Sequence, residues 1–278
     1  LVYAQLMTEV AQEASDTIEK HVELAQKYES VGMLSHSDVL AAKVEALKAK
    51  QNIVEAQNST RLAALKLGQV LSVDSAIELS ASDMPEDNFT VTLDELESYQ
   101  KQAIENRNEF KRLEVGERAA RKRETIALLD YVPQVFLIGR YQYTHGIEVL
   151  EPENQAILGI GMAWTIFDGL ESHYKAKQAA FEADEFSARS EEARELIALD
   201  VAQKYLALST ALERVKLTSQ AVVLADENLR TITAQFEQGE SVNTDVLAAQ
   251  TRRTAARADD VKARIDILAA YAGLKLSM

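Results

Sequence analysis

The side chains of this sequence that could take part in chemistry are few and scattered. The four histidines show no His-x3-His spacing, and they are His21, His36, His145 and His173. His36 stands between two serines, but the sequence offers it no orienting partner of the kind that a catalytic base needs. The segment Gly239-Glu240-Ser241-Val242-Asn243 lacks the final glycine of a nucleophile elbow, and there is no glycine-rich phosphate-binding loop. We therefore expect a protein that is not an enzyme, with no catalytic residue, no metal site and no cofactor.

The amino-acid composition excludes several further classes of protein. Of the 278 residues, 47% are hydrophobic, which is too many for a disordered chain. The formal net charge of -14 gives no electrostatic reason to bind nucleic acid. The absence of cysteine excludes disulfides and thiolate chemistry. No run of about 18 apolar residues is present, so we expect no transmembrane helix.

One motif occurs twice. Residues 32–42 read Gly-Met-Leu-Ser-His-Ser-Asp-Val-Leu-Ala-Ala, and residues 239–249 read Gly-Glu-Ser-Val-Asn-Thr-Asp-Val-Leu-Ala-Ala. A glycine in the left-handed C′ position would end the helix before each motif. The following helix would be capped by Ser37 or Asp38 in the first copy and by Thr244 or Asp245 in the second. Each copy therefore predicts a tight turn between two helices.

Long helices must position these turns. No glycine or proline lies between Gly169 and Gly239, so residues 170–237 can form one helix of roughly 100 Å. Residues from Val201 to Phe236 repeat in steps of four and three, as does a more polar series from Leu40 to Leu65. This periodicity indicates a coiled coil or a bundle. A coiled coil that only holds other parts together has the same pattern.

One region alternates instead. In residues 135–143 and 157–167, successive side chains are apolar and then small or polar, which predicts two strands of a membrane β-barrel. The residues expected to face lipid are Leu158, Ile160, Met162, Trp164 and Ile166. Gly159, Gly161 and Ala163 would face the other side, and the loop from His145 to Gln155 would join the strands. For an isolated hairpin, packing against helices is the favoured alternative, and the internal repeat shifts the balance toward the membrane.

Taken in order, these segments resemble the TolC-like outer-membrane efflux channels. The two glycine turns match the family's periplasmic helix turns. Asp130-Tyr131-Val132-Pro133-Gln134 is similar to the entry of its second membrane hairpin, and residues 164–169, Trp-Thr-Ile-Phe-Asp-Gly, to the exit. Residues 103–110 resemble a helix opening that commonly reads Arg-Pro-Asp/Glu-Leu, with Asn108 in place of the proline.

The resemblance implies a mainly α fold of long antiparallel coiled-coil helices, an α-barrel protomer with one β-hairpin that contributes to a membrane β-barrel. It implies a homotrimer in the outer membrane of a Gram-negative bacterium, in contact with outer-membrane lipid and with the helical part in the periplasm. The function implied is a passive exit duct for efflux or type I secretion that docks a periplasmic adaptor and serves an inner-membrane pump. The alternative is a soluble coiled-coil scaffold or adaptor rod without a conduit.

The expected divisions follow the family's two repeats. They are a first helical hairpin at 1–68 with its turn at 30–38, an irregular connection at 69–92, a helix at 93–130, a membrane hairpin at 131–168, and a second helical hairpin at 169–278 with its turn at 237–245. Family members carry a β-hairpin in each repeat. We therefore expect this chain to begin inside the first repeat and to be a fragment or a processed form.

The resemblance also implies two sites near the turns. The adaptor would dock at Val31, Gly32 and Met33 together with Gln238, Gly239 and Glu240. The gate or constriction would involve Asp38, Asp245, Phe236 and Ser241. Ala248 replaces the family's second acidic residue, Ser241 its gate-linking arginine, and Phe236 its latch tyrosine.

Overall fold

The computed structural model describes residues 1–73, 93–143 and 154–278. Most of the connection expected at 69–92 and of the loop expected at 145–155 lies outside these residues. The chain divides into two compact units, one of residues 1–96 with 202–277 and one of residues 97–201.

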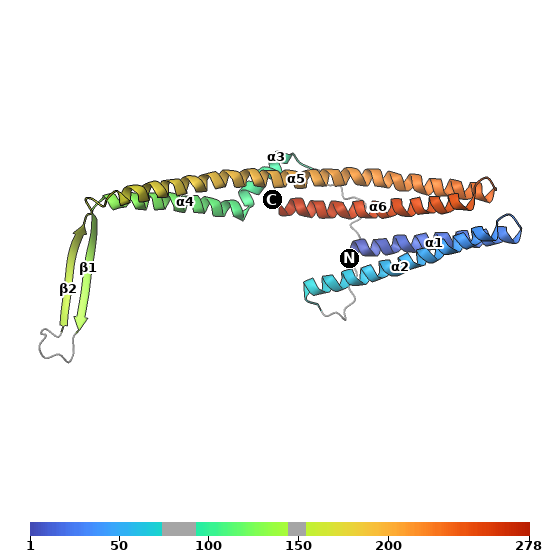
Figure 1. Cartoon of the computed structure of the whole chain (residues 1–278), viewed down its shortest axis with the longest axis horizontal. Helices are drawn as coiled ribbons and strands as arrows, with labels where there is room; N and C mark the ends of the chain where they lie inside the picture. Colours follow the sequence, from blue (N-terminus) through green and yellow to red (C-terminus); the bar gives the residue numbers. More distant parts are fainter. Residues whose placement is uncertain (74–92, 144–153) are drawn as a thin grey trace. The chain divides into compact units, whose positions relative to one another are not determined.

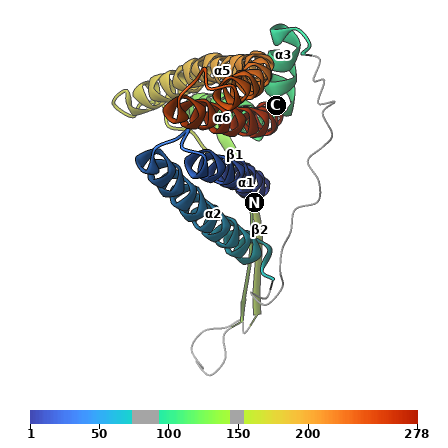
Figure 2. The same cartoon turned by 90° about the vertical axis from the view of Figure 1, so that its right-hand side faces the viewer.

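The first unit consists of two helical hairpins (Figure 1). Helix α1 (Val2–Ser30) is followed by α2 (His36–Leu71), and the second part of α5 (Glu171–Glu237) by α6 (Asn243–Leu276). The predicted uninterrupted helix over 170–237 is confirmed by α5. Helix α1 lies between α2 and α6 in both views of the molecule (Figures 1 and 2).

The two predicted heptad series have different surroundings. Val201, Leu208, Leu229 and Phe236 of the α5 series are buried, as a coiled-coil seam requires. The α2 series is not a seam of the single chain, because its apolar members Leu40, Val44, Leu47, Val54 and Leu65 are exposed. The buried side of α2 consists instead of Val39 and small residues, Ala42, Ala49 and Gly68. The predicted coiled-coil series of residues 40–65 therefore does not pack within the single chain.

A charged cluster joins α1 to the second hairpin. Asp226 on α5 accepts hydrogen bonds from Arg253 (2.5 Å) and Arg257 (3.2 Å) on α6. Both arginines also pair with Glu13 on α1. Burial opposes the ionisation of Asp226, but the two arginines outweigh it and lower the pKa of its carboxyl group.

The second unit contains α3 (Leu96–Asn106), α4 (Asn108–Leu128), the short 3-10 helix η1 (Leu129–Tyr131) and the first part of α5. Residues 93–130 therefore do not form the single helix that we expected. The chain is extended at Arg107, whose guanidinium pairs with Asp200 of α5. Asn108 then occupies the first position of α4, where proline is favoured.

The β-hairpin belongs to the second unit. Strand β1 (Gln134–Tyr143) pairs antiparallel with β2 (Asn154–Ala163). Leu137 pairs with Ile160 and Val135 with Met162, so the apolar faces of the two strands coincide as alternation predicts. Trp164 and Ile166 lie beyond the end of β2, so the alternation argument does not apply to them. The Trp164 indole instead donates to the Tyr131 carbonyl at 3.3 Å.

Candidate functional site at the helix turns

The two repeat motifs fold into the same turn. Gly32 and Gly239 are left-handed, with φ of 76° and 78°, as their predicted C′ role requires. The Gly32 amide donates to the Glu29 carbonyl and the Met33 amide to that of Tyr28, at 2.9 and 2.8 Å. The amides of Gly239 and Glu240 bind the Phe236 and Gln235 carbonyls in the same way, at 3.1 and 2.8 Å. Both turns are therefore Schellman motifs.

The start of the next helix differs between the copies. In the first copy the N-cap is Ser35, whose hydroxyl accepts from the Asp38 amide at 3.2 Å and donates to the Asp38 carboxylate at 2.5 Å. In the second copy the N-cap is Val242, which offers no side-chain bond. The expected caps Ser37, Asp38, Thr244 and Asp245 are therefore wrong, because each helix begins earlier than the motif suggests.

The residues expected at the gate differ in their burial and in their partners. Phe236 is buried in a cluster with Leu229, Val246 and Ala249, against which Tyr28 and Leu24 of α1 pack. Asp245 is exposed and accepts a hydrogen bond from Ser241 at 3.2 Å. Asp38 is half-buried at the first turn of α2.

The structure brings the two turns to one end of their hairpins (Figure 1). The Tyr28 hydroxyl at the end of α1 donates to the Glu237 carbonyl at the end of α5, at 3.2 Å. The exposed residues of the expected docking site include Val31 and Met33, with 68% and 62% of their surface accessible. A Cβ placed on Gly32 or Gly239 would meet no atom within 4 Å.

Asn243 connects three helices at this end. It is only 2% exposed, and its amide nitrogen donates to the Asp38 carbonyl of α2 at 3.0 Å. Its amide oxygen lies 2.7 Å from Nε2 of His21 on α1. Asn243 thus satisfies both of its polar atoms on the neighbouring hairpin.

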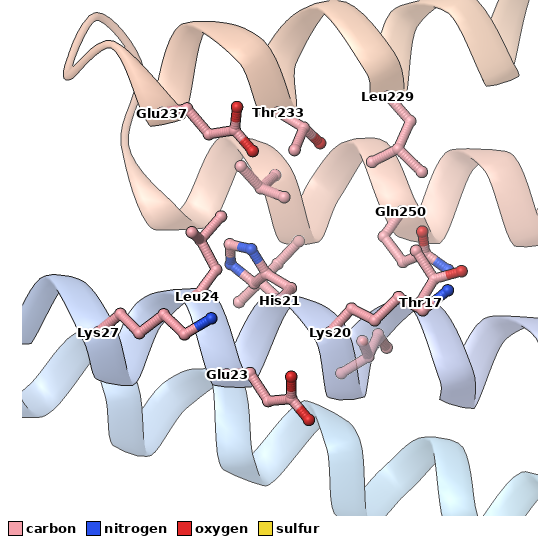
Figure 3. Close-up of a pocket in the computed structure, with 13 residues that line it drawn as sticks. Thr17, Lys20, His21, Glu23, Leu24, Lys27, Leu229, Thr233, Glu237 and Gln250 are labelled. Carbon is pink, nitrogen blue, oxygen red and sulfur yellow. The ribbon is translucent and has the colours of Figure 1, made fainter.

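A groove of about 360 Å³ lies beside this contact, between α1 and the second hairpin (Figure 3). Its apolar walls include Ile18, Leu24, Leu229 and Val246, and Lys20, Glu23, Lys27 and Glu237 supply its charges. His21 and Gln250 also line it, and both are almost fully buried.

The sequence alone did not indicate that His21, Asn243 and Gln250 belong to this end of the helical hairpins. Asn243 occupies the repeat position of His36, which is exposed and bonded to Glu29. An asparagine in a first helical turn gives no signal of burial, and nothing in the sequence links it to a histidine more than two hundred residues away.

A second candidate surface is the apolar face of the β-hairpin. Leu158, Ile160 and Met162 are exposed in the single chain, and so are Val135, Leu137 and Tyr141 across from them or beside them. The opposite face is not simply small and polar, because Phe136 lies against Gly161 and Ile138 pairs with Gly159.

Within the described ranges, no helix combines the length and the apolar character that crossing a membrane requires. Nor do three or more His, Asp or Glu side chains come together there in a way that could hold a metal ion.

The sequence from residue 100 to residue 278 matches the family model described as outer membrane efflux protein. The match covers more than half of the chain and includes the second turn and the hairpin. A search of curated proteins finds no match.

Solved structures share the fold. The outer membrane protein VceC from Vibrio cholerae is 20% identical, with a TM-score of 0.77 over 99% of this chain and 67% of that one. The outer-membrane channel OprN is 17% identical, with a TM-score of 0.81 over 99% and 62%. The open state of the outer membrane channel MtrE from Neisseria gonorrhoeae is 17% identical, with a TM-score of 0.77 over 99% and 62%. This chain thus spans about two thirds of their length, and the likeness confirms the predicted fold class.

Proposed function

Because this chain belongs to the outer membrane efflux protein family, we propose that it forms a passive, homotrimeric exit duct that docks a periplasmic adaptor and serves an inner-membrane pump. Family membership confirms the predicted location in the outer membrane with the helical part in the periplasm. The homotrimeric duct, its adaptor and its pump are inferred from the observations that follow.

The observation that carries the docking proposal is the pair of equivalent turns at one end of the first unit. Each turn presents a glycine with open space where a side chain would stand. A glycine there allows the backbone of a partner to approach closely. We therefore assign adaptor docking to Val31, Gly32, Met33, Gln238, Gly239 and Glu240.

The exposed apolar series on α2 supports the homotrimer. Leu40, Val44, Leu47, Val54 and Leu65 recur at coiled-coil spacing, yet their surfaces are between 47% and 67% accessible in the single chain. Exposed apolar surface of this extent on one helix is typical of an interface with another chain. A second copy of this chain would cover it in the assembled duct.

The docking proposal is tested by placing a large side chain at Gly32. Gly32→Trp should abolish efflux in cells that depend on this protein, while the trimer still forms on size-exclusion chromatography. Gly32→Ala is the matched control, because any side chain at this left-handed φ has a similar backbone strain, of about 1–2 kcal/mol, and only tryptophan adds bulk. Efflux that survives in the tryptophan variant, or that is lost equally in both variants, contradicts docking at this turn.

The apolar face of the hairpin is proposed to contact lipid through Leu158, Ile160 and Met162, with Trp164 and Ile166 just beyond the strand. Trp164 suits the membrane–water interface. Ile160→Lys should destabilise membrane insertion by about 2–4 kcal/mol, because a charge at mid-bilayer depth on a lipid-facing strand is costly. Recovery of the variant in the outer-membrane fraction measures this effect. Gln142→Lys on the opposite face is the control, and equal recovery of both variants would show that the face assignment is wrong.

The gate proposal concerns Asp38, Asp245, Phe236 and Ser241. In a trimer, the exposed Asp245 carboxylates would form a ring that attracts cations. Asp245 is not the N-cap, so Asp245→Asn removes the charge and leaves the α6 cap unchanged, while the amide oxygen still accepts from Ser241. Cation selectivity in a planar bilayer should then fall. Unchanged selectivity would remove Asp245 from the gate.

A further inference from the structure

The contact between His21 and Asn243 has a defined proton arrangement. The Asn243 amide nitrogen donates to the Asp38 carbonyl, so the atom that faces His21 Nε2 is the Asn243 amide oxygen, an acceptor. His21 must therefore carry its proton on Nε2 to make this 2.7 Å bond.

The other ring nitrogen, Nδ1, is then a bare acceptor. It is buried, and among the residues that the structure describes it finds no hydrogen-bond partner. Figure 3 shows the His21 ring pointing from α1 toward the second hairpin. A second proton on the ring would have to reside on Nδ1, where no described acceptor would receive it. The charged imidazolium is thus disfavoured at this position.

Neighbouring charges do not compensate. Lys20, Glu23 and Lys27 on α1 and Glu237 on α5 line the same groove, two of each sign. Helix α6 contributes only Val246, Leu247 and Gln250 to the groove, none of them charged. On α2, the Asp38 carbonyl accepts from Asn243, while the Asp38 carboxylate accepts from Ser35. The Phe236 ring is tilted against the His21 ring, and the two ring centroids are 5.2 Å apart.

We propose that the contact between His21 and Asn243 is an acid-sensitive link that holds the two helical hairpins together at their turns and releases when His21 becomes doubly protonated. In the proposed duct these turns form the periplasmic mouth, so release would loosen the mouth at acidic pH. The consequence for the duct rests on the proposed function, whereas the link itself does not.

The direction of the pH dependence follows from burial. Burial lowers the pKa of His21 below its usual 6.5, and the bond to Asn243 offsets this only in part. The unfolded or released state therefore binds more protons than the joined state in the range below pH 6.5. The link is fully formed above pH 6.5 and weakens as the pH falls through the lowered pKa.

The test measures the distance between the turns. The chain contains no cysteine, so Val31→Cys and Gln238→Cys can be labelled with nitroxides in the full chain. Dilution with unlabelled protein keeps each measured pair within one chain. Double electron–electron resonance should show a single short distance at pH 7.5 and loss of that population at pH 5.0, with a midpoint below pH 6.5.

Variants identify the group responsible. His21→Gln places an amide donor where Nε2 lies and cannot titrate, so the short distance should persist at both pH values. Asn243→Ala should lose much of the short population already at pH 7.5. His36→Gln, at the other histidine of the turns, should behave as the unmodified chain does. No change with pH, or a change that persists in His21→Gln, would overturn the proposal.

A second measurement does not depend on the His21 variant. With the other histidines replaced by glutamine, ¹⁵N magnetic resonance of His21 should show the Nε2–H form at pH 7.5 and the doubly protonated form only below pH 6.5. A ring that carries its proton on Nδ1, or both protons, at pH 7.5 would also overturn the proposal. Neither measurement involves export, so failure of the link is distinguishable from failure of the duct.

Discussion

The two helical hairpins of the first unit have the same turn but different interiors. In α1 and α2 the buried positions are mostly small, including Ala14, Ser15, Ala25, Ala42 and Ala49. In the hairpin of α5 and α6 they include large side chains, among them Leu208, Phe236, Val246 and Ile267. Small side chains let helices approach closely but bury little apolar surface per residue. The repeat therefore reproduces the turn and not the packing.

The difference extends to the residues after each turn. His36 is exposed and pairs with Glu29 at 2.6 Å, whereas its repeat counterpart Asn243 is buried and binds α1 and α2. At this position the residue of the second copy therefore joins the hairpins, while that of the first copy stays accessible. These two equivalent positions take on different roles because Asn243 faces the neighbouring hairpin and His36 does not.

The largest effect is expected at Leu208, which is fully buried in the second hairpin. Leu208→Ala should lower the free energy of unfolding by about 3 kcal/mol, because it removes buried apolar surface and leaves a cavity. Urea unfolding followed by helical circular dichroism measures this change. Leu206→Ala, on the same helix but 60% exposed, is the control and should change stability by less than about 0.5 kcal/mol. Equal losses would mean that the two faces of α5 are equally covered.

A smaller loss of stability is expected in the first hairpin, where the substitution adds volume to the interior instead of removing it. Ala42 is completely buried where α2 needs a small side chain. Ala42→Leu should destabilise by about 2 kcal/mol, because the added carbons force the helices apart. The same unfolding measurement applies, with the exposed Ala41→Leu as control. If Ala42→Leu leaves the free energy of unfolding unchanged, the space between α1 and α2 is not tightly packed at this position.

The smallest effect concerns the helix caps. Val242→Ser should stabilise α6 by about 0.5–1 kcal/mol, since it supplies the hydroxyl cap that Ser35 gives to α2. Ser35→Ala should cost about 1 kcal/mol for the same reason. Thermal unfolding of both variants compares the copies directly. If Val242→Ser has no effect, the first turn of α6 is held by Asn243 and its neighbours rather than by its cap.

Much of the fold was predictable because its signals are local. The gap between Gly169 and Gly239 determines α5, and the repeated glycines determine both turns, since only a residue without a Cβ takes a left-handed φ without strain. Alternation along 135–143 and 157–167 predicted the strands and their shared apolar face, although β2 ends at Ala163. The break at Arg107 was missed because Asn108 lacks the ring that makes a proline visible as a helix start.

The sequence by itself therefore determined the long helices of the two helical hairpins, their turns, the β-hairpin and the family, since each depends on residues close together in the chain or in a fixed order along it. Only the tertiary structure decided which face of α2 is buried and that Asn243 meets His21. The physical reason is that heptad spacing marks an apolar stripe without naming its partner. Burial and hydrogen bonding of single side chains depend on which helix lies opposite, and for His21 that helix comes from the distant end of the chain.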